Sequence, residues 1–204
     1  MTPMNGTFPN FIEKTKDGDK AFDVYSRMLK DRIVFLQGEV EEHMANHLVA
    51  QLLLLDSQSK SPITMYVNSP GGSVTAGMAI YDVMQHIQSE VVTVVIGQAC
   101  SMGSLLAQAG DKRYMTKHAR HMVHRVSSGT RGTSGSVHVQ ELEFEDAKRH
   151  LDESKKLNKI LTEIYVKHNT ANKTFDELHE TMRFDSFFSA EEAVEFGLVD
   201  EVVE

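Results

Sequence analysis

The chain has 204 residues, 41% hydrophobic and 25% charged, which is enough for one domain with a sizeable buried core. Its formal net charge of −8 argues against nucleic acid as the main partner, because phosphate binding needs clustered Lys and Arg. Its single cysteine excludes a disulfide within the chain, and no apolar run is long enough to cross a membrane.

The N-terminal part of the chain shows little regular pattern. Residues 1–20 are polar and contain glycine, so we expect a flexible N-terminal segment. Residues 21–204 are expected to form one domain, since nothing in them indicates a linker or a repeat. The first element expected there is a short helix at Ala21–Lys30, where Phe22 and Tyr25 have helical spacing.

Strands and helices then alternate. Short apolar runs predict strands at Ile33–Leu36, Ile63–Val67 and Val91–Ile96. Between them, helical patterns cover Glu41–Asp56 and Val74–Ser89. The first helix has an apolar stripe of Met44, Leu48, Leu52 and Leu55. This alternation is typical of a parallel α/β core.

A sharp turn follows the third strand. Gly97 is expected to end that strand, and small, helix-favouring residues begin at about Ser101. A serine on such a turn stands at a helix N-terminus that favours negative charge, as in a nucleophile elbow. The Gly-x-Ser-x-Gly pattern fits at Gly103 but not at Ala99. A plain helix cap is the commoner role of such a serine, so both interpretations stay open.

Two adjacent glycines follow the strand at Ile63–Val67. Gly71 and Gly72 let the backbone approach a ligand with its N–H groups exposed, as an oxyanion hole requires. A plain tight connection between a strand and a helix is the alternative interpretation.

The second half of the chain contains a loop and a long helix. After a turn at Asp111–Arg113, we expect a strand at Arg120–Val126 and a flexible polar loop at Ser127–Gly135. A long charged helix, roughly His138–His168, follows; we expect it to project and dock on a neighbour, with a merely solvated helix as the alternative. Its apolar side carries Leu142, Ala147, Leu151, Leu157, Leu161 and Ile164.

Two short helices are expected near the C-terminus. Thr174–Glu177 and Ser189–Glu192 both match the capping-box pattern that opens a helix. Gly197 is expected to end the second helix, before a last strand at Leu198–Val203.

Several motifs in this order resemble the proteolytic subunit of the Clp (caseinolytic) protease, over Ile12 to Val203. They are NSPGG at 68–72, GQACSMG at 97–103, FDVYSR at 22–27, SAEEA at 189–193 and FGLVD at 196–200. The resemblance implies an α/β fold of the ClpP/crotonase-like kind, a spiral of β-β-α units. It also implies that the long helix is a projecting handle at about residues 136–170.

The resemblance further implies a serine endopeptidase. Ser101 matches the nucleophile, His124 the base and Asp185 the residue that orients the base; spacing alone does not choose among the ten histidines. The N–H groups of Gly72 and Met102 are expected to form the oxyanion hole. Peptide-binding residues expected from the resemblance are Gly71, Gly72, Val126, Ser128 and Gly129.

Two other chemistries are less well supported. Cys100, next to Ser101, is an alternative nucleophile, but one side chain occupies the apex of an elbow and a neighbouring cysteine usually packs. His118, His121 and His124 are three residues apart, and such positions on a strand point to opposite faces. No metal site is therefore expected.

The resemblance implies heptameric rings, stacked in pairs, that receive unfolded polypeptides from an AAA+ unfoldase of the ClpX or ClpA type. Part of residues 1–20 would form a loop at the axial pore. Because the chain has no Walker-type motif, ATP is expected to be used only by the partner, and no cofactor is expected. No signal-peptide pattern opens the sequence, so we expect a cytoplasmic protein without a membrane or nucleic-acid partner.

Some positions depart from the family pattern and indicate a divergent member. Gln-Pro usually follows the histidine, whereas this chain has Arg125-Val126. The Gly-Gly of the peptide-binding strand appears as Ser128-Gly129. Phe184 stands where many relatives carry an arginine used in contacts between rings.

Two alternative functions follow from these departures and from the fold. A catalytically silent ring subunit would serve only as scaffold, although the intact Ser101, His124 and Asp185 argue against it. A crotonase-type acyl-CoA enzyme would share the fold without needing those three residues.

Overall fold

The computed structural model describes residues 11–16, 18–126 and 144–204. Two strands and a short helix open the described chain: β1 (Phe11–Thr15), β2 (Gly18–Phe22) and α1 (Val24–Lys30). The alternating part contains β3 (Ile33–Val40), α2 (Glu42–Gln58), β4 (Ile63–Gly72), α3 (Val74–His86), β5 (Val91–Cys100) and α4 (Met102–Gln108). The remainder contains β6 (Lys112–Thr116), β7 (Arg120–Val123), α5 (Phe144–His168), α6 (Phe175–Thr181), β8 (Ser186–Phe188), α7 (Ala190–Phe196) and β9 (Glu201–Val203).

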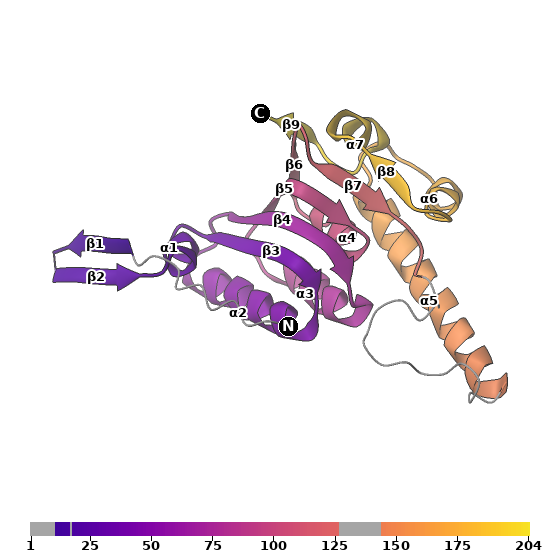
Figure 1. Cartoon of the computed structure of the whole chain (residues 1–204), viewed down its shortest axis with the longest axis horizontal. Helices are drawn as coiled ribbons and strands as arrows, with labels where there is room; N and C mark the ends of the chain where they lie inside the picture. The colour runs from indigo at the N-terminus through magenta and orange to yellow at the C-terminus, as the bar shows by residue number, and fades with distance from the viewer. Residues whose placement is uncertain (1–10, 17, 127–143) are drawn as a thin grey trace.

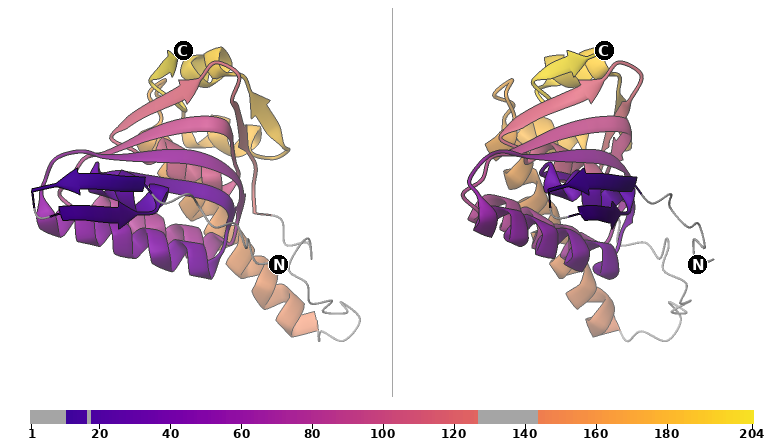
Figure 2. Two further views of the ribbon diagram at one scale, coloured as in Figure 1. Left: turned by 60° about the vertical axis from the view of Figure 1, so that its left-hand side comes forward. Right: turned by 90° about the vertical axis from the view of Figure 1, so that its left-hand side faces the viewer.

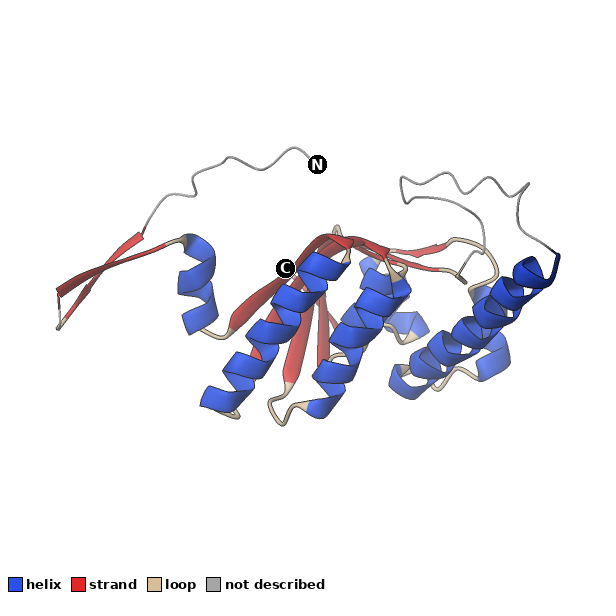
Figure 3. Ribbon diagram, turned by 90° about the horizontal axis from the view of Figure 1, so that it is seen from below, coloured by secondary structure: helices blue, strands red, loops and turns tan. Residues whose placement is uncertain are grey.

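A mostly parallel sheet organises the fold. Its strands follow the order β3-β4-β5-β6-β9, while β7 pairs with β5 and with β8. The pairings of this sheet are parallel except that between β7 and β8. Helices α2 and α3 lie side by side along one face of the sheet (Figures 1 and 3). The predicted α/β fold is therefore confirmed.

The strand β5 changes its partner halfway along. Val92–Val95 pair with β6, whereas Gln98–Cys100 pair with β7. Gly97 lies between these segments with φ +76°, a backbone conformation that favours glycine. The expectation that Gly97 ends the strand is wrong: it bends the strand, and hydrogen bonding resumes with a new neighbour.

The strand β4 also runs further than its apolar pattern indicates, as far as Gly72, which pairs with Val40 of β3. The pattern ends early because the last residues of β4 are small or polar. They lie at the carboxyl edge of the sheet, where ligands bind in open α/β folds.

The core forms between the sheet and the helices beneath it. The predicted stripe of α2 faces this core, since Leu48, Leu52 and Leu55 are at most 2% exposed. Helix α4, which follows the serine turn, has every residue buried. The start of α4 is therefore held rigidly beside the sheet.

The N-terminal part of the described chain is an antiparallel hairpin of β1 and β2 that projects from the sheet (Figures 1 and 2). The flexibility expected for residues 1–20 stays a prediction, but the described part of this segment forms two strands that the sequence pattern did not indicate. The side chains of β2 are exposed up to its last residue, so the hairpin leaves no alternating apolar pattern. Phe22 ends β2, and the side chain of Asp23 caps α1 through the Ser26 N–H.

The long helix α5 projects away from the sheet (Figure 1). This helix was expected to begin at His138, but residues 138–143 lie outside the described residues. The same is true of the expected loop Ser127–Gly135. Among residues 148–168, whose exposure the structure describes, burial is confined to the C-terminal part of α5 and includes Leu161, Ile164 and Tyr165, whereas Leu151 is 47% exposed.

The C-terminal elements agree with the capping signals. Both capping boxes have their two hydrogen bonds, and Gly197 ends α7 with φ +84°. The last strand is shorter than expected, and β6 and β8 were not expected. The turn expected at Asp111–Arg113 includes the first two residues of β6.

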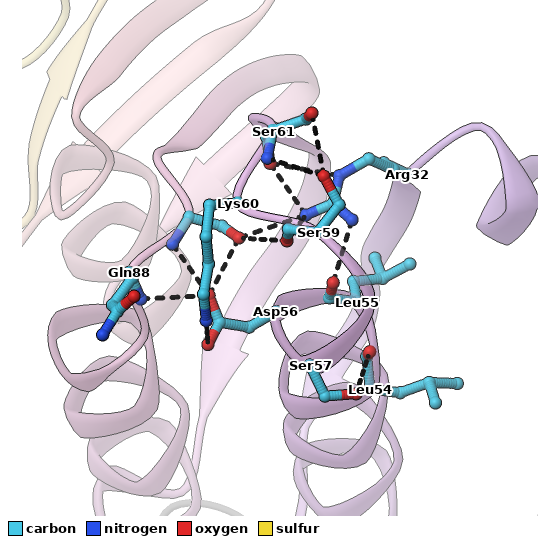
Figure 4. Close-up of polar contacts among 10 residues, drawn as sticks. Arg32, Leu54, Leu55, Asp56, Ser57, Ser59, Lys60, Ser61 and Gln88 are labelled. Carbon is cyan, nitrogen blue, oxygen red and sulfur yellow. Dashed lines mark hydrogen bonds and ion pairs between the residues drawn. The ribbon is translucent and has the colours of Figure 1, made fainter.

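A polar cluster connects the end of α2 to the edge of the sheet at which the strands begin, which is opposite to their carboxyl edge (Figure 4). Arg32 donates to Ser89 Oγ and to the carbonyl oxygens of Leu55, Ser59, Ser61 and Pro62. Asp56 accepts hydrogen bonds from Lys60 Nζ and from the N–H groups of Gln88 and Ser89. Arg32 thus gives donors to carbonyl groups at the end of α2 and in the segment that follows it, and Asp56 gives an acceptor to two N–H groups ahead of β5.

Candidate active site

Ser101 occupies a strained turn between β5 and α4. Its φ of 55° and ψ of −122° lie outside the regions that non-glycine residues usually adopt. Its N–H donates to the Met122 carbonyl at 2.9 Å, and its carbonyl accepts from the Leu105 N–H at 3.1 Å. The turn thus has the strand–turn–helix context of a nucleophile elbow.

Three side chains that are distant in the sequence form one hydrogen-bonded chain. His124 Nε2 lies 2.8 Å from Ser101 Oγ, and His124 Nδ1 lies 2.9 Å from Asp185 Oδ1. A neutral imidazole that donates from Nδ1 to the carboxylate has Nε2 free to accept from the serine hydroxyl. The arrangement can therefore remove a proton from Ser101.

Strand register brings these three residues together. Cys100 of β5 lies opposite Met122 of β7, so the residues just beyond the two strands, Ser101 and His124, become neighbours. Val123 in turn lies opposite Ser186 of β8, which places Asp185 beside His124. The pairing β5–β7–β8 thus positions all three groups.

The paired glycines lie against this turn. A Cβ on Gly71 would be 2.6 Å from the Cys100 carbonyl oxygen and 2.7 Å from Ser101 Cβ, so only glycine fits there. Gly72 follows with φ +151° and lies against Val40. Met102 is the first residue of α4, where N–H groups lack partners within the helix. The oxyanion role of Gly72 and Met102 stays a prediction.

A small cavity of about 20 Å³ opens beside Ser101 and His124. Its other walls are largely apolar and come from α3, α4, α5 and the segments after β7 and α6. They are formed by Val74, Met102, Leu105, Val126, Leu161, Tyr165 and Met182. The space next to the nucleophile is therefore walled mainly by apolar side chains and is about large enough for one water molecule.

Cys100 does not share the position of Ser101. Its side chain is nearly buried, and Sγ lies 3.6 Å from Gln98 Oε1. Burial, with a smaller effect of the Asp185 charge, raises the pKa of the thiol, which lowers the fraction of reactive thiolate. The geometry thus favours serine over cysteine as the reactive group.

The three spaced histidines lie in three different settings. His118 precedes β7 and is exposed, His121 is within β7 and fully buried, and His124 follows it. Neither ring nitrogen of His121 has a hydrogen-bond partner, and burial lowers its pKa to about 3. Among the described residues, no group of three or more His, Cys, Asp or Glu side chains is placed to hold a metal ion.

Two contacts of α5 with the site were not foreseen from the sequence. Asn158 Oδ1 accepts from the Val126 N–H at 2.7 Å, and Asn158 Nδ2 donates to the Val126 carbonyl at 3.2 Å. The Tyr165 hydroxyl donates to Ser104 Oγ at 2.8 Å. Both residues lie on the stripe of α5 that contains Leu161, and this spacing was the available signal.

The remaining peptide-binding residues expected from the sequence are only partly described. Val126 lines the cavity, but Ser128 and Gly129 lie outside the described residues. No helix in the described ranges is long and apolar enough to span a bilayer.

Comparison with known protein families supports the assignment suggested by these residues. A sequence model of the family described as Clp protease matches residues 16–204, which is most of the chain.

Proposed function

Because the chain belongs to the Clp protease family, we propose that it is a serine endopeptidase with Ser101, His124 and Asp185 as its catalytic residues. One observation carries the proposal: the continuous hydrogen-bonded chain from Ser101 Oγ through His124 to Asp185, at 2.8 and 2.9 Å. Nucleophile, base and orienting carboxylate have the relative geometry that defines such a triad, regardless of their order in the sequence.

The mechanism follows from this geometry. His124 Nε2 takes the hydroxyl proton as Ser101 Oγ attacks the peptide carbonyl, and Asp185 stabilises the resulting imidazolium. The Gly72 and Met102 N–H groups would stabilise the negative oxygen of the tetrahedral intermediate. His124 then donates its proton to the leaving amine, and water releases the acyl group from Ser101.

The proposed substrate is unfolded polypeptide. An extended peptide would pair with the backbone of Gly71, Gly72, Ser128 and Gly129. It would contact Val126 through that residue's side chain, because the Val126 backbone groups bond to Asn158. The apolar walls of the cavity beside Ser101 would contact the side chain that precedes the cleaved bond.

The proposed context is a closed chamber. Family membership implies oligomeric assembly. We propose heptameric rings stacked in pairs, and an AAA+ unfoldase of the ClpX or ClpA type that uses ATP to deliver substrate. We further propose that the chain needs no cofactor and acts in the cytoplasm.

Reaction with a fluorophosphonate, followed by peptide mapping, tests the proposal. We expect the label on Ser101, and we expect Ser101→Ala to lose labelling and peptide cleavage by several orders of magnitude while still assembling. Cys100→Ser is the matched control and should keep both. An assembled native chain that neither labels nor cleaves would be a scaffold subunit, and binding of coenzyme A would support the acyl-CoA alternative.

A further inference from the structure

The chain segment that carries His124 leaves the sheet just before that residue. The strand β7 ends at Val123, so the ladder with β5 no longer fixes the positions that follow. Contacts with other elements then hold the backbone. The Arg125 N–H donates to the Met182 carbonyl at 2.7 Å, and Arg125 Nη2 donates to the His179 carbonyl at 2.6 Å.

The next residue, Val126, is held by a single side chain of α5. The amide of Asn158 accepts from the Val126 N–H at 2.7 Å and donates to the Val126 carbonyl at 3.2 Å. A side-chain amide has the donor and the acceptor needed for both bonds, so it pairs with Val126 as the peptide group of a neighbouring strand would. Asn158 is half-buried, which limits competition by water.

The same stripe of α5 reaches the other parts of the site. Leu161 lines the cavity beside Ser101, and the Tyr165 hydroxyl contacts Ser104 and the Ser101 carbonyl. Positions 158, 161 and 165 are three and four residues apart, so they share one face of the helix. One rigid helix therefore contacts both the nucleophile turn and the segment after the base.

We propose that Asn158 is a positioning residue for His124. By holding both backbone polar groups of Val126, it fixes the chain two residues beyond the imidazole and keeps Nε2 within reach of Ser101 Oγ. This inference rests on the proposed function as a serine peptidase. It also means that peptide cleavage depends on where α5 lies relative to the sheet.

The test compares kcat and KM for a short peptide in the assembled native chain and three variants. Asn158→Leu removes both hydrogen bonds, and we expect kcat to fall on the order of 10-fold to 100-fold with KM unchanged, because a misplaced catalytic group slows the chemical step. Asn158→Asp keeps an acceptor for the Val126 N–H and should lose less. Lys159→Ala, at the adjacent exposed position, should match the native chain.

Each other outcome has a defined meaning. Native kcat and KM in both Asn158 variants would overturn the proposal. So would a lower KM at unchanged kcat, which would show that Asn158 merely competes with the peptide for Val126. If Asn158→Leu does not assemble, kcat and KM of the near-isosteric Asn158→Asp alone test the proposal. A native chain that does not react with a fluorophosphonate would instead overturn the proposed function.

Discussion

The hydroxyl of Tyr165 on α5 lies 2.8 Å from Ser104 Oγ, inside the first turn of the helix that Ser101 begins. Tyr165 is fully buried, and burial raises the pKa of its phenol far above the usual range. The phenol is therefore a neutral donor at any working pH. The hydroxyl also lies 3.4 Å from the Ser101 carbonyl oxygen, so Tyr165 contacts the strained turn directly.

Removing this hydroxyl should cost both stability and activity. Tyr165→Phe leaves Ser104 without a buried partner, which typically costs about 1–3 kcal/mol. We expect a lower urea midpoint and a lower kcat with little change in KM. A Tyr165→Phe/Ser104→Ala double variant should lose less stability than the sum of the single losses, since both partners disappear together. Strict additivity would show that the contact is not energetically coupled.

Acid should destabilise the protein through His121. Its pKa falls from an ordinary 6.5 to about 3 because the ring is fully buried without a hydrogen-bond partner. Below pH 6.5 the His121 imidazole is protonated in the unfolded chain but stays neutral in the folded chain. The free energy of unfolding therefore falls as the pH drops from 6.5 towards 3. The slope from this residue is about 1.4 kcal/mol per pH unit at most.

A His121→Leu variant isolates this effect. Urea unfolding between pH 7 and 4.5 should show a shallower loss of stability in the variant than in the native chain. His168, whose pKa burial lowers to about 4, and the carboxylates with lowered pKa are common to both proteins. Parallel curves for the two proteins would show that His121 is protonated in the folded state or exposed to water.

The Arg32–Asp56 cluster should affect stability without affecting chemistry. A hydrogen bond from Lys60, with others from Ser89, holds the pKa of Asp56 well below its usual range. Asp56→Ala and Arg32→Lys should both lower the urea midpoint. The first leaves the Gln88 and Ser89 N–H groups without their acceptor, and the second leaves some of the carbonyl oxygens around Arg32 without their donor. Fluorophosphonate labelling of the folded variants should proceed at the native rate. Slower labelling would connect this edge to the site.

If the chain forms stacked rings as proposed, the contribution of Phe184, next to Asp185, to this stacking should depend weakly on salt. Phe184 is 71% exposed, and the Arg183 guanidinium lies 5.5 Å from its ring centroid while also pairing with Glu180. An apolar contact made by the Phe184 phenyl group is not weakened by dissolved ions. The attraction in exposed ion pairs, in contrast, is screened within about 10 Å at 0.1 M salt. Sedimentation across a salt series should show stable double rings in the native chain and greater salt sensitivity in Phe184→Arg. Dissociation of the native double ring at modest salt would contradict this.

The alternating part of the fold was predictable because burial leaves a pattern in the sequence. The stripe of α2 and the β-branched run of β5 face the core and therefore must be apolar. The strands that were missed or shortened, such as β8 and the end of β4, are maintained by backbone pairing at exposed or polar positions. Backbone hydrogen bonds leave no such pattern, so those strands were not foreseen.

The candidate site was predictable only through resemblance. Spacing alone did not select His124 among ten histidines, because the register between β5 and β7 is set in three dimensions. Asn158 was missed for a similar reason: an asparagine within a charged helix is ordinary until its neighbour across the fold is known. The hairpin of β1 and β2 was not predicted, because strands with exposed faces need no alternation of apolar and polar residues.

The pairing of β7 with β8 has a consequence for protein synthesis. Asp185 follows His124 by 61 residues, and the pairing of Val123 with Ser186 requires α5 and α6 to be made first. A nascent chain on the ribosome therefore contains the serine and the histidine well before the group that orients them. Under the proposed mechanism, a chain that has not yet been made as far as Asp185 lacks the residue that orients His124, so it should cleave other chains far more slowly than the folded protein does.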